Sequence, residues 1–120
     1  MMRILILAWL LLVPILPAAA PTAAGPQVTP EILEFDRKLC PICKASEQII
    51  QSVRVMFPGQ FAVRRLYIDE EEPVFRRYRV AIVPTQVFLD AAGKEVFRHE
   101  GVFPKEKLIE KMRELKFIKE

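Results

Sequence analysis

The sequence predicts an α/β fold in which a mixed sheet of about four strands is flanked by helices in three layers. Three observations support this prediction. Apolar residues follow strand-like and helix-like periods in the order strand, helix, strand, helix, strand, strand, helix. Charged residues become frequent only after Pro30. Both cysteines of the chain lie at the start of the first helical pattern, so the chemistry is expected there.

The front of the chain reads as an export signal. Among the first 30 residues, Arg3 is the only charged one, and it precedes an apolar run and then a stretch of small residues. The run of 13 residues, Ile4 to Leu16, is short for a membrane span, which needs about 20. We interpret residues 1–24 as a signal peptide or an uncleaved N-terminal membrane anchor, and 25–30 as a linker. Either outcome places the domain, residues 31–120, outside the cytoplasm, in a periplasm or on the exterior of the cell envelope.

The first half of the domain has the pattern of a strand, a helix and a second strand. A nearly continuous apolar run over 32–36 predicts a strand covered on both faces. Pro41 suits the first helical position, where its missing N–H has no partner, and Pro58-Gly59 ends the helix. Residues that favour strands predict a second strand over 61–68. The two strands are expected to pair in parallel through the helical crossover.

The second half adds a helix, a hairpin and a last helix. An acidic run opens the helix predicted over 69–78, where its carboxylates offset the positive helix end. Strands over 85–90 and 95–99 are joined by a short turn and therefore should pair antiparallel. A final helix opens at Phe103-Pro104, and its apolar stripe comprises Leu108, Ile109, Met112 and Leu115.

The charge of the domain implies no particular partner. Without the front segment, the chain has seventeen bases and fifteen acids, a net charge near +2. The bases are scattered and have no interleaved exposed aromatics, which predicts a solvated face and no nucleic-acid binding. These scattered bases include Arg64, Arg65, Arg76, Arg77 and Arg79. We expect the protein to be a monomer.

The two cysteines are separated by Pro41 and Ile42. In the first turn of a helix, thiols at this spacing can close a disulfide, and the helix dipole stabilises the thiolate of Cys40, which we expect to be partly exposed. The alternative is half of a metal site, but zinc needs two further ligands. The other soft candidate, His99, stands alone on a predicted edge strand. We therefore expect a redox pair without a metal or cofactor. Nearby bases that could lower the pKa of the thiol are Arg37, Lys38 and Lys44.

These features together resemble the thioredoxin family. The resemblance extends from about residue 32 to 115 and implies a thioredoxin-like three-layer sandwich with thiol–disulfide oxidoreductase activity. It rests on the element order and on matched segments at the family's spacing. These segments are Cys40 to Cys43 at a helix start, Ile82-Val83-Pro84-Thr85 opening a later strand, Gly93 in the hairpin and Gly101 after it.

The resemblance also implies roles for individual residues. Cys40 is the expected nucleophile and Cys43 the resolving thiol. Glu34, six residues before Cys40, matches a buried acid that takes the proton of Cys43 during resolution; the alternative is an exposed strand residue without a role. Pro84 matches a proline after a cis peptide bond, which leaves the backbone of Val83 free to pair with substrate. The alternative there is an ordinary trans proline at a strand start.

The sequence departs from the common family pattern beside the cysteines. Leu39 replaces the usual tryptophan, and Pro41-Ile42 replaces Gly-Pro, so we expect these three residues to influence substrate contact and redox poise. A buried acid favours a reductant, while a disulfide-forming oxidase or isomerase, or an interaction domain without turnover, are the alternatives. By analogy, the substrates are disulfides of exported proteins, apocytochromes c during cytochrome c biogenesis among them, and the electron donor is a membrane thiol transporter.

Overall fold

The structure is a computed structural model that describes residues 29–120. The predicted signal or anchor, 1–24, and most of the linker, through residue 28, lie outside the described residues. The elements occur in the order that the sequence predicts, with ends within about two residues of the expected ones. They are β1 (Glu31–Asp36), α1 (Pro41–Met56), β2 (Ala62–Tyr67), α2 (Ile68–Arg77), β3 (Thr85–Leu89), β4 (Glu95–Glu100) and α3 (Lys105–Glu114).

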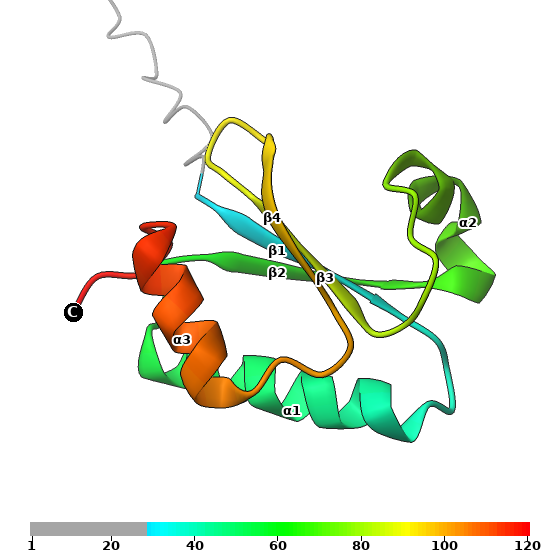
Figure 1. The fold of residues 1–120 in the computed structure, drawn as a ribbon, viewed down its shortest axis with the longest axis horizontal. Coiled ribbons are helices and arrows are strands. Elements are labelled where there is room, and N and C mark those ends of the chain that lie inside the picture. Colours follow the sequence, from blue (N-terminus) through cyan, green and yellow to red (C-terminus); the bar gives the residue numbers. More distant parts are fainter. Residues whose placement is uncertain (1–28) are drawn as a thin grey trace, which may run out of the picture.

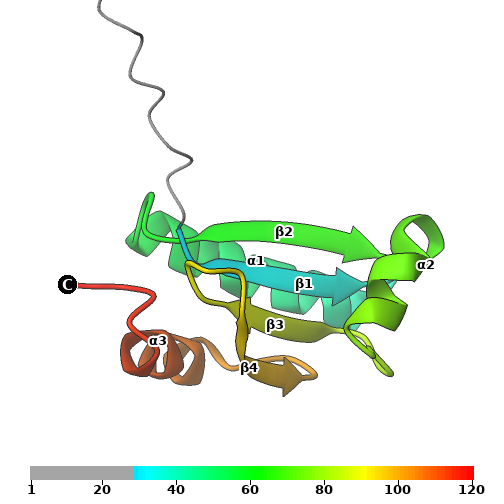
Figure 2. The ribbon, with the colours of Figure 1, turned by 90° about the horizontal axis from the view of Figure 1, so that it is seen from above.

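The four strands form one mixed sheet in the order β2-β1-β3-β4. β1 and β2 are parallel, joined through α1, whereas β1 with β3 and β3 with β4 are antiparallel. Figure 2 shows β1 between β2 and β3, with β4 at one edge. The predicted parallel crossover and the predicted hairpin are therefore both confirmed. Because β1 is an interior strand, its last residues, which lead to the cysteines, have a strand on either side.

Helices cover both faces of this sheet and make three layers (Figure 1). α1 and α3 pack on one face, and α2 packs on the other near one end. Because successive strand residues point to opposite faces, Ile32 joins the core beneath α1 and α3, while Leu33 and Phe35 join the core on the side of α2. The alternation also puts Glu34 and Asp36 on the α1 face.

The start of α1 follows from its sequence. Cys40 is the N-cap residue with an extended backbone, and Pro41 occupies the first turn, where no N–H is needed. The helix ends at Met56, just before Pro58-Gly59, where Gly59 has φ +73°. This geometry holds the cysteine pair at the N-terminal end of a long, well-packed helix.

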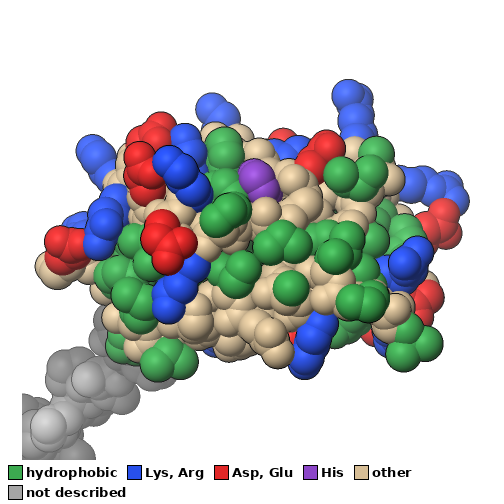
Figure 3. All heavy atoms as spheres, turned by 60° about the horizontal axis from the view of Figure 1, so that its bottom comes forward, with side chains coloured by type: hydrophobic (Ala, Val, Ile, Leu, Met, Phe, Trp, Pro, Cys, Tyr) green, Lys and Arg blue, Asp and Glu red, His purple; other side chains and the backbone are tan. Residues whose placement is uncertain are grey.

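The surface has charges of both signs. On the face shown in Figure 3, hydrophobic side chains form a band across the molecule, with Lys, Arg, Asp and Glu side chains around it. Basic side chains there lie apart from one another or beside acidic ones, as expected for a solvated face. Within residues 29–120, none of the helices is long and apolar enough to cross a membrane.

Candidate active site

Cys40 and Cys43 form a disulfide at the N-terminal end of α1. The backbone N–H of Cys43 points at Cys40 Sγ, with 3.3 Å between the two atoms. A helix amide and the positive helix end therefore act on the sulfur that the sequence analysis expects to be the nucleophile. Cys40 is 8% exposed and Cys43 4%. Cys40 is therefore buried in this oxidised state, and the expectation that it is partly exposed is wrong here.

A pocket of about 680 Å³ opens beside the disulfide. Leu39 and Pro41, expected to contact substrate, both contribute to its wall, and Leu39 is fully exposed. Leu39 has φ +57°, a left-handed conformation that costs a non-glycine residue about 1 kcal/mol. Ile42 is 55% exposed but lies outside this wall. The pocket is lined by Asp36, Arg37, Lys38, Leu39, Cys40, Pro41, Cys43, Lys44, Glu47 and Tyr67.

The peptide bond between Val83 and Pro84 is cis, which is the geometry that the resemblance implies. Pro84 is buried, and its carbonyl accepts a 2.7 Å hydrogen bond from the N–H of Gly101. Gly101 has φ +89°, which explains why a glycine stands there. Val83 is half-buried, and neither Val83 nor Pro84 lines the pocket beside the cysteines.

Glu34 is fully buried in β1, so the alternative of an exposed strand residue is wrong. Its Oε2 accepts a 2.7 Å hydrogen bond from Arg65, while Oε1 has no hydrogen-bond partner. Burial raises the pKa of Glu34 above its ordinary value, and the hydrogen bond and charge of Arg65 oppose this rise. Glu34 does not line the pocket.

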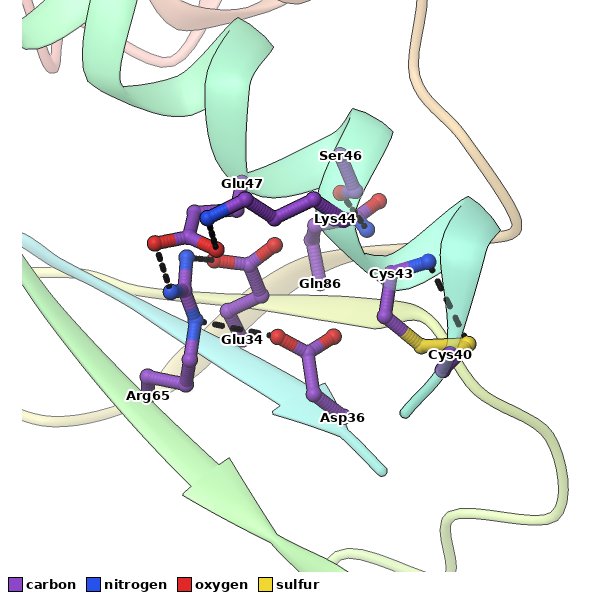
Figure 4. A network of polar contacts seen from close by, with 9 residues as sticks. All are labelled: Glu34, Asp36, Cys40, Cys43, Lys44, Ser46, Glu47, Arg65 and Gln86. Carbon is purple, nitrogen blue, oxygen red and sulfur yellow. Dashed lines mark hydrogen bonds and ion pairs between the residues drawn. A yellow bond between two sulfur atoms is a disulfide. The ribbon is translucent and has the colours of Figure 1, made fainter. Parts of the chain in front are cut away.

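Arg65 contacts three carboxylates (Figure 4). Besides Glu34, it approaches Asp36 Oδ2 through Nε at 3.0 Å and Glu47 Oε1 through Nη1 at 2.5 Å. Its side chain is only 18% exposed, so its assignment to the solvated face was wrong. Burial by itself lowers the pKa of Arg65, but the hydrogen bonds to Glu34 and Glu47 raise it overall. The guanidinium is a permanent charge under the active site.

A buried polar pair lies next to this cluster. Gln86 on β3 donates a 3.0 Å hydrogen bond from Nε2 to Ser46 Oγ on α1, and both residues are at most 2% exposed. Gln86 pairs with Glu34 in the register of β1 and β3. Neither Ser46 nor Gln86 stands out as a site residue in the sequence, and the same holds for Glu47 and, without the strand period, for Asp36. For Asp36 a signal existed, because it stands two positions after Glu34 and so faces the same side of the strand.

Two of the bases expected to lower the pKa of Cys40 are engaged by acids. Lys38 pairs with Glu70 and lies 3.7 Å from Asp69, and Lys44 Nζ is 3.2 Å from Glu47. Arg37 lines the pocket and has no ion pair within the part of the chain that the structure describes. Of these three bases, Arg37 is therefore the one that no acid among residues 29–120 neutralises.

His99 occupies the edge strand β4, as expected. Its Nε2 is 3.3 Å from the carbonyl of Val102, and its ring packs on Phe103 at 4.0 Å between centroids. Across residues 29–120, no group of three or more His, Cys, Asp and Glu side chains is arranged to hold a metal ion.

The mixed sheet, the disulfide at a helix start and the cis-proline segment define a thioredoxin-like protein. The family model described as a thioredoxin-like domain matches residues 17–116. The chain therefore belongs to the thioredoxin-like domain family. This confirms both the resemblance and the predicted fold.

Solved thioredoxins have the same fold. A thioredoxin-2 described as a component of malaria parasite protein secretion machinery aligns with a TM-score of 0.68 at 19% identity, over 72% of this chain and 82% of that one. The germline-specific thioredoxin Deadhead from Drosophila melanogaster gives 0.65 at 26%, over 72% and 81%. Chloroplastic thioredoxin z gives 0.68 at 24%, over 75% and 80%. No match was found among the curated proteins.

Proposed function

We propose that this chain is an exported thiol–disulfide oxidoreductase that reduces disulfides of extracytoplasmic proteins through Cys40 and Cys43. The thioredoxin-like fold with its Cys-x-x-Cys pair suggests thiol–disulfide oxidoreductase activity. The observation that supports this most is the placement of the pair. The N–H of Cys43 in the first turn of α1 donates a hydrogen bond to Cys40 Sγ, and Cys40 lines a pocket. Cys43 lies one helical turn further along and is joined to Cys40 by the disulfide.

The exchange proceeds in two steps that balance without a cofactor. The Cys40 thiolate attacks a sulfur of the substrate disulfide, and the other substrate sulfur leaves with the electron pair. Cys43 then loses its proton and attacks Cys40 Sγ, which breaks the mixed disulfide and releases the second substrate thiolate. Two electrons pass from the dithiol to the substrate, and the pair ends as the disulfide seen in the structure.

A buried carboxyl beneath the pair supplies the base for the second step, and the resemblance assigns this role to Glu34. Its burial supports the proposal because burial raises the pKa of a carboxyl towards the range in which it exchanges protons at neutral pH. Such an acid also favours a reductant over a strong oxidant. Val83, beside the cis bond, offers its backbone to an extended substrate segment, and Leu39, Pro41 and Ile42 add apolar contacts.

The cellular setting follows from the front segment. An export signal over 1–24 places the domain in an oxidising compartment, where a reductant has to be recharged. A membrane thiol transporter is the proposed donor, and disulfides in exported proteins, including apocytochromes c, are the proposed substrates.

A trapping experiment tests the activity and the substrates together. In Cys43→Ser, a mixed disulfide on Cys40 cannot resolve, so the full-length variant should carry covalent partner proteins that a reducing agent releases. Cys40→Ser is the matched control, because it has one thiol as well but lacks the nucleophile. Failure of Cys43→Ser to retain any partner, while Cys40 is free and the protein abundant, would count against exchange.

The direction of electron flow is tested by equilibration with glutathione. A pair that is oxidised in buffers where glutathione is mostly reduced is a reductant, as proposed. A pair that is reduced under those conditions is the oxidase or isomerase that the sequence leaves as the alternative.

A further inference from the structure

Asp36, the last residue of β1, is one of two carboxyl groups that line the pocket beside the cysteine pair, and unlike Glu47 it is buried. Its side chain is 2% exposed, and it lines the same pocket as Cys40 and Cys43. Oδ2 contacts Arg65, but Oδ1 is buried and has no hydrogen-bond partner. Figure 4 shows this free oxygen on the side of the cysteines. A buried carboxylate oxygen without a donor is costly unless it holds a proton or receives one.

Glu34 occupies a different place on the same face of β1. Its Oε1 is also buried without a hydrogen-bond partner, but Oε2 receives a 2.7 Å hydrogen bond from Arg65, which favours the ionised form. Unlike Asp36, Glu34 does not line the pocket. The contact of Asp36 with Arg65 is looser, because Arg65 Nε is not aligned to donate a hydrogen bond. Of the two buried acids, Asp36 is therefore both closer to the pocket and less tightly held as an anion.

The charges around Arg65 do not balance. Glu47 is half-buried, and its hydrogen bond from Arg65, assisted by Lys44, lowers its pKa. It therefore remains ionised. Glu34 and Asp36 are then two buried carboxyls for one shared guanidinium, so full ionisation of both is unfavourable. Burial, reinforced by the charge of Glu34, raises the pKa of Asp36 from 3.8 to about 7.

The other groups facing Asp36 do not cancel this effect. Lys38 and Lys44 have acidic partners of their own, and Arg37 is exposed and is not among the charges that shift the pKa of Asp36. The charged and titratable groups that face Asp36 are Glu34 from β1, Arg65 and Tyr67 from β2, Cys40, Cys43, Lys44 and Glu47 from the start of α1, and Arg37 and Lys38 from the connection.

We propose that Asp36, and not Glu34, is the group that exchanges the proton of Cys43 during thiol–disulfide exchange. The proposal rests on the activity proposed above and reassigns one of its steps. Cys43 Sγ–H gives its proton to Asp36 Oδ1, directly or through one water of the pocket, as its sulfur attacks Cys40 Sγ. The bond from Cys40 to substrate breaks, the electron pair leaves with the substrate sulfur, and Asp36 returns the proton to solvent. Glu34 remains a fixed charge on Arg65.

Stopped-flow kinetics with 5,5′-dithiobis(2-nitrobenzoate) separates the two steps in the reduced, full-length protein. Attack by Cys40 releases one coloured thiolate, and resolution by Cys43 releases a second. An excess of reagent makes the first release fast. In the wild type, the rate of the second release should rise with pH through a midpoint near 7. Cys43→Ser is the control that gives the first release alone.

Asp36→Asn and Glu34→Gln are the matched variants, since each removes one carboxyl at nearly constant size. Asp36→Asn should slow the second release about tenfold to a hundredfold at pH 7 and abolish the midpoint, with less effect on the first. Glu34→Gln should change the second release by less than about threefold. A second release within twofold of wild type in Asp36→Asn overturns the proposal, as does loss of the midpoint in Glu34→Gln alone. Absence of any second release from the wild type contradicts the exchange activity itself.

Carbon-13 NMR of the unmodified chain provides a measurement that does not depend on how a variant folds. If Asp36 exchanges its proton with the pair, its carboxyl signal should titrate with different midpoints in the oxidised and reduced proteins, because the two equilibria are linked. Identical midpoints in the two redox states overturn the proposal.

Discussion

Arg65 and Glu34 lie side by side on the parallel strands β2 and β1, and their side chains are joined by a 2.7 Å hydrogen bond. Neighbouring residues of parallel strands face the same side of the sheet, so the pairing aims the guanidinium under α1. There it also reaches Asp36 from the same strand and Glu47 from the helix. One half-buried cation thus connects both strands and α1 next to the pocket of the cysteines.

Arg65→Met should destabilise the protein by about 3 to 5 kcal/mol at pH 8, because it leaves buried carboxylates without their cation. The loss should be smaller at pH 5, where these acids can take protons. Arg64→Met is the control: Arg64 is its neighbour, is 55% exposed and pairs with Glu31 at 3.2 Å, so its removal should cost less than about 1 kcal/mol. Urea unfolding of the oxidised proteins measures both. Equal losses of unfolding free energy in the two variants would show that Arg65 in the cluster contributes no more to stability than the exposed ion pair of Arg64.

Asp36→Asn should stabilise the oxidised protein at high pH. The pKa of Asp36 is raised from 3.8 to about 7, so the folded state holds a proton that the unfolded chain has already released. Its contribution is therefore fully present below about pH 4 and is lost as pH rises to about 7. Removing the carboxyl should raise the free energy of unfolding by about 2 to 4 kcal/mol at pH 8 and by little at pH 4. Glu110→Gln, an exposed carboxyl, is the control. A wild-type stability that does not fall between pH 4 and 8 relative to Asp36→Asn refutes the prediction.

The element order could be predicted because each segment has its own hydrophobic periodicity and ends at residues, such as Pro and Gly, that interrupt a helix or strand. Pro41 starts α1 and Pro58-Gly59 ends it, whatever the rest of the chain does. Glu34 could be recognised as buried from its apolar neighbours on both sides. The family resemblance supplied the cis bond at Pro84, which local patterns do not predict.

The charge cluster could not be predicted because it depends on strand register. In the sequence, Arg65 follows Arg64 and therefore resembles a solvent-exposed basic residue. Only the register of β1 and β2, which sets Arg65 beside Glu34, places its side chain beneath α1. Asp36 shares its face of β1 with Glu34, but it ends the strand, where an acid usually meets solvent, so its burial was not evident. α1 covers both positions, and the sequence gives no direct sign of which strand residues a helix will cover.

Ser46→Ala should destabilise the protein by about 1 to 3 kcal/mol, because it removes the hydrogen-bond acceptor of the buried Gln86 amide. In a double variant with Gln86→Leu, most of that loss should be recovered, since no unpaired amide remains. Ser52→Ala, on the same helix but only partly buried, is the control. Denaturant unfolding of the two single variants and the double variant measures the coupling. Losses that simply add would mean that the two side chains do not depend on each other.

Leu39→Asn should slow the reduction of protein disulfides about threefold to tenfold while leaving the reduction of a small disulfide unchanged. Leu39 is fully exposed beside the pocket, so a protein substrate that covers it removes apolar surface from water, and loss of that burial weakens the encounter. Asparagine tolerates the left-handed backbone at this position, so the change should not disturb the approach to Cys40. Val55→Asn is the matched control, because Val55 is 80% exposed but lies near the other end of α1. Values of kcat/KM for the two substrates, measured in both variants, give the comparison. Equal effects in Leu39→Asn and Val55→Asn would contradict a direct contact of Leu39 with protein substrates.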